Sequence, residues 1–255
     1  MEICHIADIN RLIYGPPFWK GPLDVLHRDA WRKIAETGTW FAGLSPGFST
    51  ALLDLAEPLT LVAGERLFAR DDAPDGLYGI LRGVMRISAT SASGQEALLA
   101  MLEPPQWFGE IAVFDGAART HDAWAVEACL LLRVRQAALL ALMAETPNYW
   151  RELGLLVTQK LRLTFNSVEE LSLLPPTKRV AGRLLLMAGG YGAWNNQTKR
   201  IVAVSQEQLG LMLALSRQTV NQSLKELESG ACIKRNRAVI EILDIEKLQQ
   251  MRDGE

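Results

Sequence analysis

The sequence predicts an α+β fold, with a β-rich N-terminal part, one long helix, and a helix-rich C-terminal part that contains small strands. Between residues 57 and 135, strand-length apolar runs alternate with Gly- and Asp-containing turns, which is typical of a β roll, barrel or sandwich. After Val134 the pattern becomes helical, and a long helix is expected from about Asn148 to Leu173, where Pro175-Pro176 ends it. The 80 residues after Pro175 then form a basic, mainly helical segment.

The composition is that of an ordinary globular protein: 255 residues, of which 49% are hydrophobic and 22% are charged. Cys4, Cys129 and Cys232 are too far apart for a metal-ligand motif or a disulfide framework, which suits a reducing compartment. The chain has no signal-peptide pattern at its start and no apolar run of membrane-spanning length. We therefore expect a cytoplasmic protein without a membrane partner. The usual hydrolase, zinc-protease and nucleotide-loop motifs are missing, so we expect neither enzymatic activity nor a metal site.

Charge is distributed unevenly along the chain. Residues 1–175 contain 15 Lys and Arg against 21 Asp and Glu, a net charge of −6, whereas residues 176–255 contain 12 against 8, a net charge of +4. Such asymmetry indicates an anionic partner for the C-terminal part alone. Charge by itself also permits a simpler interpretation, a solvated basic face.

Changes of pattern and the proline stops divide the chain into four segments. We expect an N-terminal arm at 1–40, a β-roll domain at 41–147, a separate long helix at 148–174 and a basic C-terminal domain at 175–255. The prolines and glycine between residues 16 and 22 predict a loose arm, with one short helix near Asp29–Thr37.

The long helix carries an apolar stripe with steps of 4, 4, 3, 4 and 3 residues. Its members are Leu153, Val157, Leu161, Thr164, Val168 and Leu171. This spacing is typical of a helix that packs lengthwise against a similar helix, and the same helix of a second subunit is the simplest partner. We therefore predict a homodimer. The alternative is that the stripe packs on the helix's own β domain.

Two short helices in the basic segment are expected to form a helix-turn-helix. Ser205 and Ser216 stand at N-cap positions, and Gln208 completes a capping box with Ser205. Only residues 213–215 remain for the turn, so the two helices must cross steeply.

The second of these helices presents side chains that can read base edges, and we predict that it binds double-stranded DNA. The expected base contacts are Arg217, Gln218, Asn221 and Gln222. Phosphate contacts are expected at the two helix N-termini and at the tip of a following hairpin, or wing, that turns at 235–237: Ser205, Gln206, Ser216, Thr219, Lys234, Arg235 and Arg237.

The segment Phe108–Ala112, followed by Arg119-Thr120, has the chemistry of a nucleotide site. Glu110 can accept hydrogen bonds from ribose hydroxyls, Arg119 can neutralise a phosphate, and Gly109 lets the backbone approach a ligand closely. A structural salt bridge from Arg119 to Asp115 or Asp122 is the competing interpretation.

These motifs resemble a known family. FGEIAVFDGAARTHDAWA resembles the phosphate-binding cassette of cyclic-nucleotide-binding domains, and GERLFARDDAPDGLYGILRGVMRIS resembles the entry to their β-roll. Together with the long helix and SRQTVNQSLKEL, the order is similar to that of the CRP/FNR family of bacterial transcription regulators, over about residues 45–245. The resemblance implies a cyclic-nucleotide-binding-like β-roll, a dimerisation helix and a winged helix-turn-helix.

The resemblance also implies how such a protein works. A small effector, cAMP or another cyclic nucleotide, would bind the β-roll against the long helix and reorient two DNA-binding domains, and RNA polymerase would be a further partner. The implied effector contacts are Gly109, Glu110, Ile111, Ala112, Arg119, Thr120 and Thr164. No iron–sulfur cluster is expected, because Cys4 is the only cysteine near the N-terminus. Two alternatives stay open: a regulator that needs no ligand or responds to a non-nucleotide effector, and a ligand-binding module without DNA function.

Overall fold

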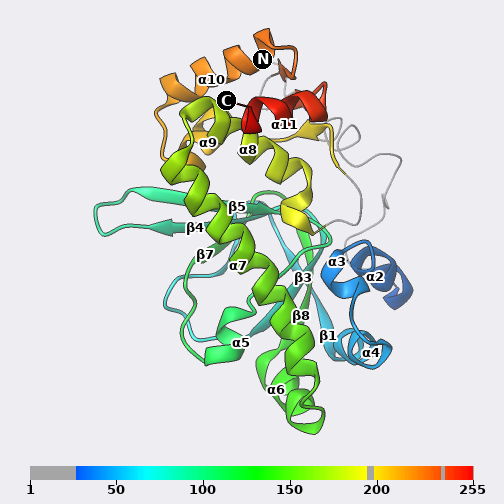
Figure 1. The fold of residues 1–255 in the computed structure, drawn as a ribbon. Coiled ribbons are helices and arrows are strands. Elements are labelled where there is room, and N and C mark those ends of the chain that lie inside the picture. Colours follow the sequence, from blue (N-terminus) through cyan, green and yellow to red (C-terminus); the bar gives the residue numbers. More distant parts are fainter. Residues whose placement is uncertain (1–26, 194–197, 237–238, 255) are drawn as a thin grey trace. The chain divides into compact units, whose positions relative to one another are not determined.

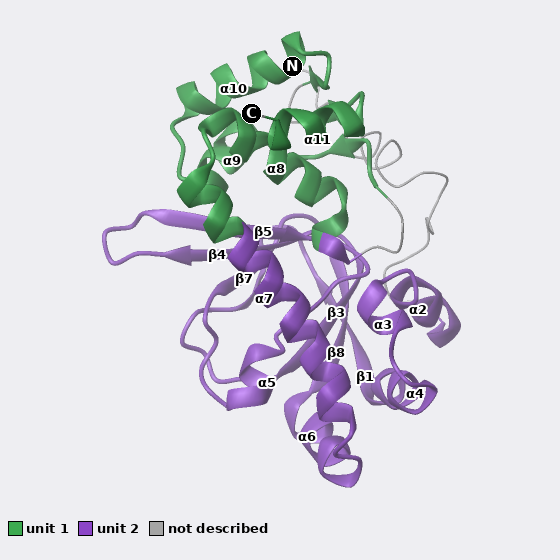
Figure 2. Ribbon diagram, viewed as in Figure 1, with its two compact units in different colours: residues 1–22, 167–191, 197–255 green, residues 23–166, 192–196 purple. Residues whose placement is uncertain are grey.

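The structure is a computed structural model that describes residues 27–193, 198–236 and 239–254 (Figure 1). The chain divides into two compact units (Figure 2). One contains residues 23–166 and 192–196, and is called the β-roll unit below; the other contains 1–22, 167–191 and 197–255, and is called the DNA-binding unit. The α+β prediction is confirmed.

The β-roll unit consists of short N-terminal helices, eight strands and three further helices. In chain order its elements are α2 (Arg28–Ala35), α3 (Thr39–Ala42), α4 (Pro46–Leu55), β1 (Ala56–Leu61), β2 (Arg66–Phe68), β3 (Gly76–Arg82), β4 (Met85–Thr90), β5 (Glu96–Leu102), β6 (Trp107–Phe108), α5 (Ile111–Asp115), β7 (Asp122–Ala125), β8 (Cys129–Arg135), α6 (Gln136–Glu145) and the first part of α7 (Tyr149–Leu173).

The strands form two four-stranded antiparallel sheets, in the orders β1-β8-β3-β6 and β2-β7-β4-β5. Strand β3 shows how the sequence builds two cores, because successive side chains of a strand point to opposite faces. Tyr78 and Ile80 lie in the core between the sheets, whereas Leu77 and Leu81 lie in a second core under the helices. Because both faces of β3 are covered, its residues are buried one after another and do not alternate between buried and exposed.

The N-terminal segment is packed where it is described. We expected residues 1–40 to form a loose arm, but Trp31 and Ala35 of α2 are buried in the helix-side core, and Trp40 and Phe41 pack against Trp107. The short helix expected near Asp29–Thr37 is present as α2, but the described part of the segment is packed rather than loose, because its large aromatic side chains are buried. Residues 1–26 lie outside the described part of the chain.

Helix α7 is one continuous helix, as predicted, but its apolar stripe is buried at its start and exposed further along. Leu153 is fully buried in the helix-side core together with Leu156, so Leu153 packs inside its own subunit and was wrongly assigned to a dimer interface. Val157 is half-buried, and Leu161, Thr164, Val168 and Leu171 are exposed.

The DNA-binding unit is built from helices around a small sheet. Its elements after α7 are α8 (Pro176–Ala188), β9 (Ile201–Val202), α9 (Gln206–Leu213), α10 (Arg217–Ser229), β10 (Ile233–Asn236), β11 (Val239–Ile242) and α11 (Ile245–Asp253), with a short 3-10 turn at Gly190–Gly192 between α8 and β9. The three strands form an antiparallel sheet in the order β10-β11-β9.

Helices α9 and α10 form the predicted helix-turn-helix. Ser205 accepts a hydrogen bond from the backbone of Gln208 in a complete capping box, and Ser216 caps α10. The turn is closed by Ala214, whose φ of 50° places it in the left-handed region, and buried Val220 and Leu224 fix the inner face of α10.

Candidate functional site

The cassette begins where β6 ends and the short helix α5 starts. Gly109 has a φ of +94°, and a Cβ there would lie 2.9 Å from both Arg119 Nη1 and the carbonyl oxygen of Gly76. Only glycine fits this position, which lets the guanidinium lie directly against the backbone. Glu110 follows as the N-cap of α5 and is 3% exposed.

Arg119 is the buried centre of the site, with an exposed fraction of 3%. Its Nη1 donates to the Gly109 carbonyl at 3.1 Å, and its Nη2 donates to the Gly76 carbonyl at 2.8 Å and to Asp75 Oδ1 at 2.5 Å. The guanidinium carbon lies 4.3 Å from the centroid of the Phe68 ring. Its Nε is buried and has no hydrogen-bond acceptor, so one strong donor of a buried cation is unsatisfied.

The counter-charge of Arg119 is Asp75. A structural salt bridge of Arg119 does form, as the competing interpretation expected, but not to the named partners: Asp115 accepts from the backbone N–H of Ala117, and Asp122 accepts from that of Arg70. Asp75 also accepts a hydrogen bond from the hydroxyl of Tyr78. Burial, together with this carboxylate, raises the pKa of Tyr78 well above its usual value, so Tyr78 stays a neutral donor.

Glu110 also has an internal partner, Lys160 of helix α7. Lys160 Nζ lies 2.7 Å from Glu110 Oε2, and the Glu110 side chain is almost fully buried. Sequence reasoning missed Lys160. The available signal was its position one helical turn before Thr164, where two polar residues interrupt the apolar pattern of the helix.

The other predicted effector residues lie around these two ion pairs. Ala112 is buried, and Ile111 and Thr120 are exposed. The Thr120 hydroxyl is 2.8 Å from Nδ1 of His121. Thr164 is exposed and donates to the Lys160 carbonyl at 2.9 Å. Arg119 thus contacts Gly109, and Glu110 contacts Lys160 of α7. The two threonine hydroxyls make only local contacts.

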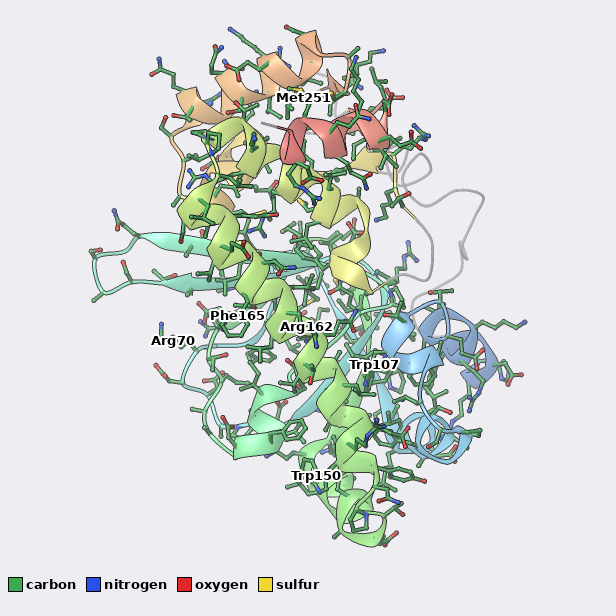
Figure 3. The ribbon with its side chains drawn as sticks, viewed as in Figure 1. Arg70, Trp107, Trp150, Arg162, Phe165 and Met251 are labelled. Carbon is green, nitrogen blue, oxygen red and sulfur yellow. The ribbon has the colours of Figure 1, made fainter. Side chains whose placement is uncertain are left out.

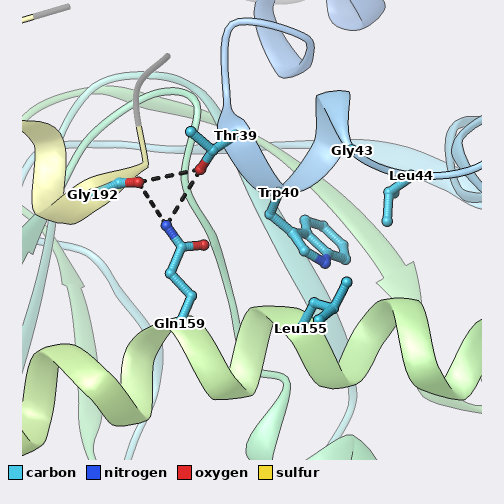
Figure 4. A pocket seen from close by; sticks show the side chains of 7 residues that line it. All are labelled: Thr39, Trp40, Gly43, Leu44, Leu155, Gln159 and Gly192. Atoms are coloured by element: carbon cyan, nitrogen blue, oxygen red, sulfur yellow. Dashed lines mark hydrogen bonds between the residues drawn. The ribbon is translucent and has the colours of Figure 1, made fainter. Parts of the chain in front are cut away.

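A separate hollow of about 370 Å³ lies between α3 and α7 (Figure 4). Its polar groups satisfy one another: Gln159 Nε2 donates to the Gly192 carbonyl at 2.6 Å and to the Thr39 hydroxyl at 3.3 Å, and that hydroxyl donates to the same carbonyl at 3.2 Å. Trp40, Gly43, Leu44 and Leu155 complete the lining. None of the described residues that line this hollow is charged, and a nucleotide phosphate would find no cation among them.

In the DNA-binding unit the predicted base-reading residues fall into two groups. Arg217 and Gln218, in the first turn of α10, are exposed. Asn221 and Gln222 have partners within the unit: Asn221 Oδ1 accepts from Arg235, and Gln222 Nε2 donates to Glu226 at 3.0 Å.

The predicted phosphate contacts also differ from one another. Lys234 is exposed, while Arg235 lies inside strand β10 rather than at the turn and is bound to Glu228. The expected turn at 235–237 was therefore placed too early, because β10 extends to Asn236. Ser205, Ser216 and Thr219 contribute to the helix N-termini, where Gln206 is the first residue of α9. Arg237 lies outside the described residues.

Within the described residues, no group of three or more His, Cys, Asp and Glu side chains is arranged to hold a metal ion. Across the same part of the chain, no helix is both long and apolar enough to cross a membrane.

Comparison with known families gives a consistent result. Residues 58–146 match the cyclic nucleotide-binding domain, and residues 178–251 match the Crp-like helix-turn-helix domain. The chain belongs to the CRP/FNR family. This CRP/FNR protein is a DNA-binding transcription regulator with a cyclic nucleotide-binding domain.

Relatives of this CRP/FNR regulator match it over most of their length. It is 28% identical over 209 residues to the CRP-like cAMP-activated global transcriptional regulator of Mycobacterium tuberculosis, covering 82% of this chain and 93% of that protein. It is 27% identical to the cyclic AMP receptor protein of Thermus thermophilus, covering 84% of this chain and 96% of that protein.

Solved structures support the fold of the CRP/FNR regulator. FixK2 from Bradyrhizobium japonicum has a TM-score of 0.68 at 18% identity, covering 78% of this chain and 98% of that chain. The c-di-GMP responsive regulator CLP of Xanthomonas campestris has a TM-score of 0.62 at 18% identity, covering 78% of this chain and 99% of that chain.

Proposed function

We propose that this regulator binds a cyclic nucleotide, cAMP before others, in its β-roll unit and binds DNA as a homodimer. The observation that carries the effector proposal is that Glu110 and Arg119 are both buried and carry opposite charges, and that Arg119 donates to the carbonyl of Gly109, the residue directly before Glu110. A cyclic nucleotide needs both, since its ribose hydroxyl donates and its phosphate accepts. The name of the M. tuberculosis relative, cAMP-activated, adds support for this class of effector.

Each residue would have a defined role. The Nε of Arg119 has no hydrogen-bond acceptor within the protein, and a phosphate oxygen would supply one. Lys160 binds only one oxygen of Glu110, so the other can accept from a ribose hydroxyl. Thr120 and Thr164 offer exposed hydroxyls for the phosphate and the base.

The alternative, a regulator that is active without ligand or responds to a different effector, is favoured by one observation. Arg119 and Glu110 are already neutralised internally, by Asp75 and Lys160. An anion entering this site meets no net positive charge from the four groups together.

Titration calorimetry with cAMP, cGMP and c-di-GMP separates the two candidates, with duplex binding measured in the presence and absence of each nucleotide. We expect heat with cAMP or cGMP and tighter DNA binding in its presence. Heat with c-di-GMP alone would point to a different effector of the same site. Equal DNA binding and no heat with any of the three would establish the ligand-independent alternative.

We further propose that the protein is cytoplasmic, that it dimerises through α7 and that it acts together with RNA polymerase. In a dimer, two copies of α10 would enter successive major grooves, about 34 Å apart. Exposed Arg217 and Gln218 at the start of α10 would then read base edges, because arginine pairs with guanine and glutamine with adenine.

Two substitutions distinguish base reading from phosphate binding. Arg217→Ala should relax sequence specificity, with a loss of about 1–3 kcal/mol confined to the preferred duplex. Lys234→Ala should weaken binding to all duplexes and lower the salt dependence by about one unit of slope. Fluorescence anisotropy at several salt concentrations measures both effects. Equal discrimination by Arg217→Ala and the parent protein would contradict the recognition role of α10.

A further inference from the structure

Arg235, on strand β10 of the wing, is bound to two residues of helix α10. Its backbone N–H donates to Glu228 Oε1 at 2.9 Å, and its Nε donates to Glu228 Oε2 at 2.7 Å. Its Nη1 donates to Asn221 Oδ1 at 3.0 Å. One guanidinium thus joins a carboxylate and an amide that lie two helical turns apart on the same face of α10.

These contacts commit most of the donors that Arg235 could offer to DNA. The guanidinium has five N–H donors, and Nε, Nη1 and Nη2 all point at partners within the unit, with Nη2 2.7 Å from Glu228 Oε2. The Arg235 side chain is 26% exposed. Hydrogen bonds from Arg235 lower the pKa of Glu228, so this carboxylate stays ionised and holds the arginine across the neutral pH range. Lys234, next to it, is exposed.

The same contacts restrict what Asn221 can read. An asparagine recognises adenine through two hydrogen bonds, with its oxygen accepting from N6 and its NH₂ donating to N7. Arg235 occupies one of the two lone pairs of the Asn221 oxygen and fixes the amide, so this oxygen is a poorer acceptor for N6 of adenine than that of a free asparagine. The NH₂ donors stay fully available, and these suit adjacent acceptors such as O6 and N7 of guanine, or O4 of thymine.

We propose that Arg235 is a specificity-determining residue that acts through Asn221. Held by Glu228, it turns Asn221 into a hydrogen-bond donor that selects guanine or thymine and disfavours adenine at one base pair. The inference rests on the proposed entry of α10 into the major groove. Arg235 is accordingly a positioning residue, and its loss changes sequence preference rather than general DNA affinity.

The test is selection of bound duplexes from a pool with a randomised core, followed by sequencing, with the full-length protein and its variants. Asn221→Ala first identifies the base pair that depends on Asn221. Arg235→Lys keeps a cation beside Glu228 but lacks the planar fork that reaches Asn221. We expect Arg235→Lys and Arg235→Met to raise the adenine preference at that base pair by roughly tenfold, the discrimination typical of one freed bidentate contact.

Two controls make the result specific. Asn221→Asp keeps an acceptor for Arg235 but has no NH₂ group, so it should lose the guanine or thymine preference, and thermal unfolding checks that this variant is folded. Lys234→Ala, next to Arg235 but outside its contacts, should weaken all duplexes and leave the preference at that base pair unchanged.

The inference is overturned if Arg235→Lys and Arg235→Met, shown by thermal unfolding to be folded, keep the parent's preference at the Asn221 base pair. It is also overturned if they weaken all duplexes equally, which is the result of a purely structural role or of a phosphate contact. If neither Arg217→Ala nor Asn221→Ala changes any position, the assignment of α10 as the reading helix fails, and this inference fails with it.

Discussion

Asp75→Asn should tighten cAMP binding about tenfold, and Arg119→Gln should weaken it by more than a hundredfold. Asp75 binds Nη2 of Arg119 at 2.5 Å, so a phosphate that approaches the same guanidinium also meets a carboxylate. Two like charges about 4 Å apart repel by about 1 kcal/mol in water and about 4 kcal/mol near a protein surface. The Asp75 side chain is 46% exposed, which favours the lower part of that range, about 1.4 kcal/mol or tenfold.

The opposite effect of Arg119→Gln follows from its burial. Glutamine keeps a hydrogen-bond donor but no charge, and a charge-assisted bidentate contact to phosphate is replaced at best by a neutral one. Because removing a buried cation leaves Asp75 without its partner, thermal unfolding of this variant must be measured alongside calorimetry with cAMP.

Asp72→Asn is the matched control for Asp75→Asn. Asp72 lies in the same loop and carries the same charge, but its carboxylate accepts from the backbone N–H of Ala69 rather than from Arg119. It should leave cAMP affinity nearly unchanged. Weaker binding by Asp75→Asn would mean that Asp75 orients Arg119 for the ligand, and the competition argument would be wrong. If the parent and Asp75→Asn both fail to bind cAMP and cGMP, the cyclic-nucleotide proposal itself is wrong.

The residues of the cassette could be predicted from the sequence, but their partners could not. Glu110 and Arg119 stand in one short motif whose chemistry is local, so their types and spacing were informative. Asp75 and Lys160 come from segments 44 and 50 residues away from the groups they bind, and only the sheet pairing and the packing of α7 bring them there. Asp75 is one of several aspartates in its loop, and nothing in the sequence marks it as the partner of Arg119.

The same limit applies to the DNA-binding unit and to the N-terminal segment. Arg235 was predicted as a free basic side chain because residue type alone cannot show on which side of a hairpin it lies. The short helix near Asp29–Thr37 was predicted and is present as α2, but the packing of this segment was not predicted, because the prolines and glycine that precede it indicated a loose arm. The local signal that could have been weighed more heavily is the aromatic content of this segment, since Trp31, Trp40 and Phe41 are large enough to require burial.

The exposed apolar row on α7 leads to the second prediction with a large effect. Phe165→Glu should convert the protein into a monomer. Leu161, Phe165 and Val168 are 49%, 65% and 54% exposed within one chain (Figure 3 labels Phe165 on α7). Full burial of each such side chain is worth about 1.5–3 kcal/mol, so leaving this row in water is costly unless a partner covers it. Phe165 was missing from the predicted stripe because Thr164 was assigned at this turn, although Phe165 also lies four residues after Leu161 and three before Val168.

In a two-fold dimer the same face of both helices meets, so one substitution places two glutamates in the same apolar seam. Sedimentation or light scattering should show the mass of a single chain. DNA affinity should fall by about a hundredfold or more, because two half-sites are no longer bound by linked modules. Asn166→Glu is the control: it adds the same charge one residue later, at an exposed position about 100° further round the helix. It should remain dimeric.

A dimeric Phe165→Glu variant with unchanged DNA affinity would show that α7 does not form the interface. The row would then be covered by another contact, and the predicted linkage between the effector site and the DNA would lose its physical path. Lys160, which binds Glu110, lies one residue before Leu161 on this helix. A ligand whose ribose hydroxyl donates to the second oxygen of Glu110 therefore acts directly beside the proposed seam. Dimerisation and effector binding should consequently be coupled, and cAMP should shift the monomer–dimer equilibrium of the weakened Leu161→Ala variant towards the dimer.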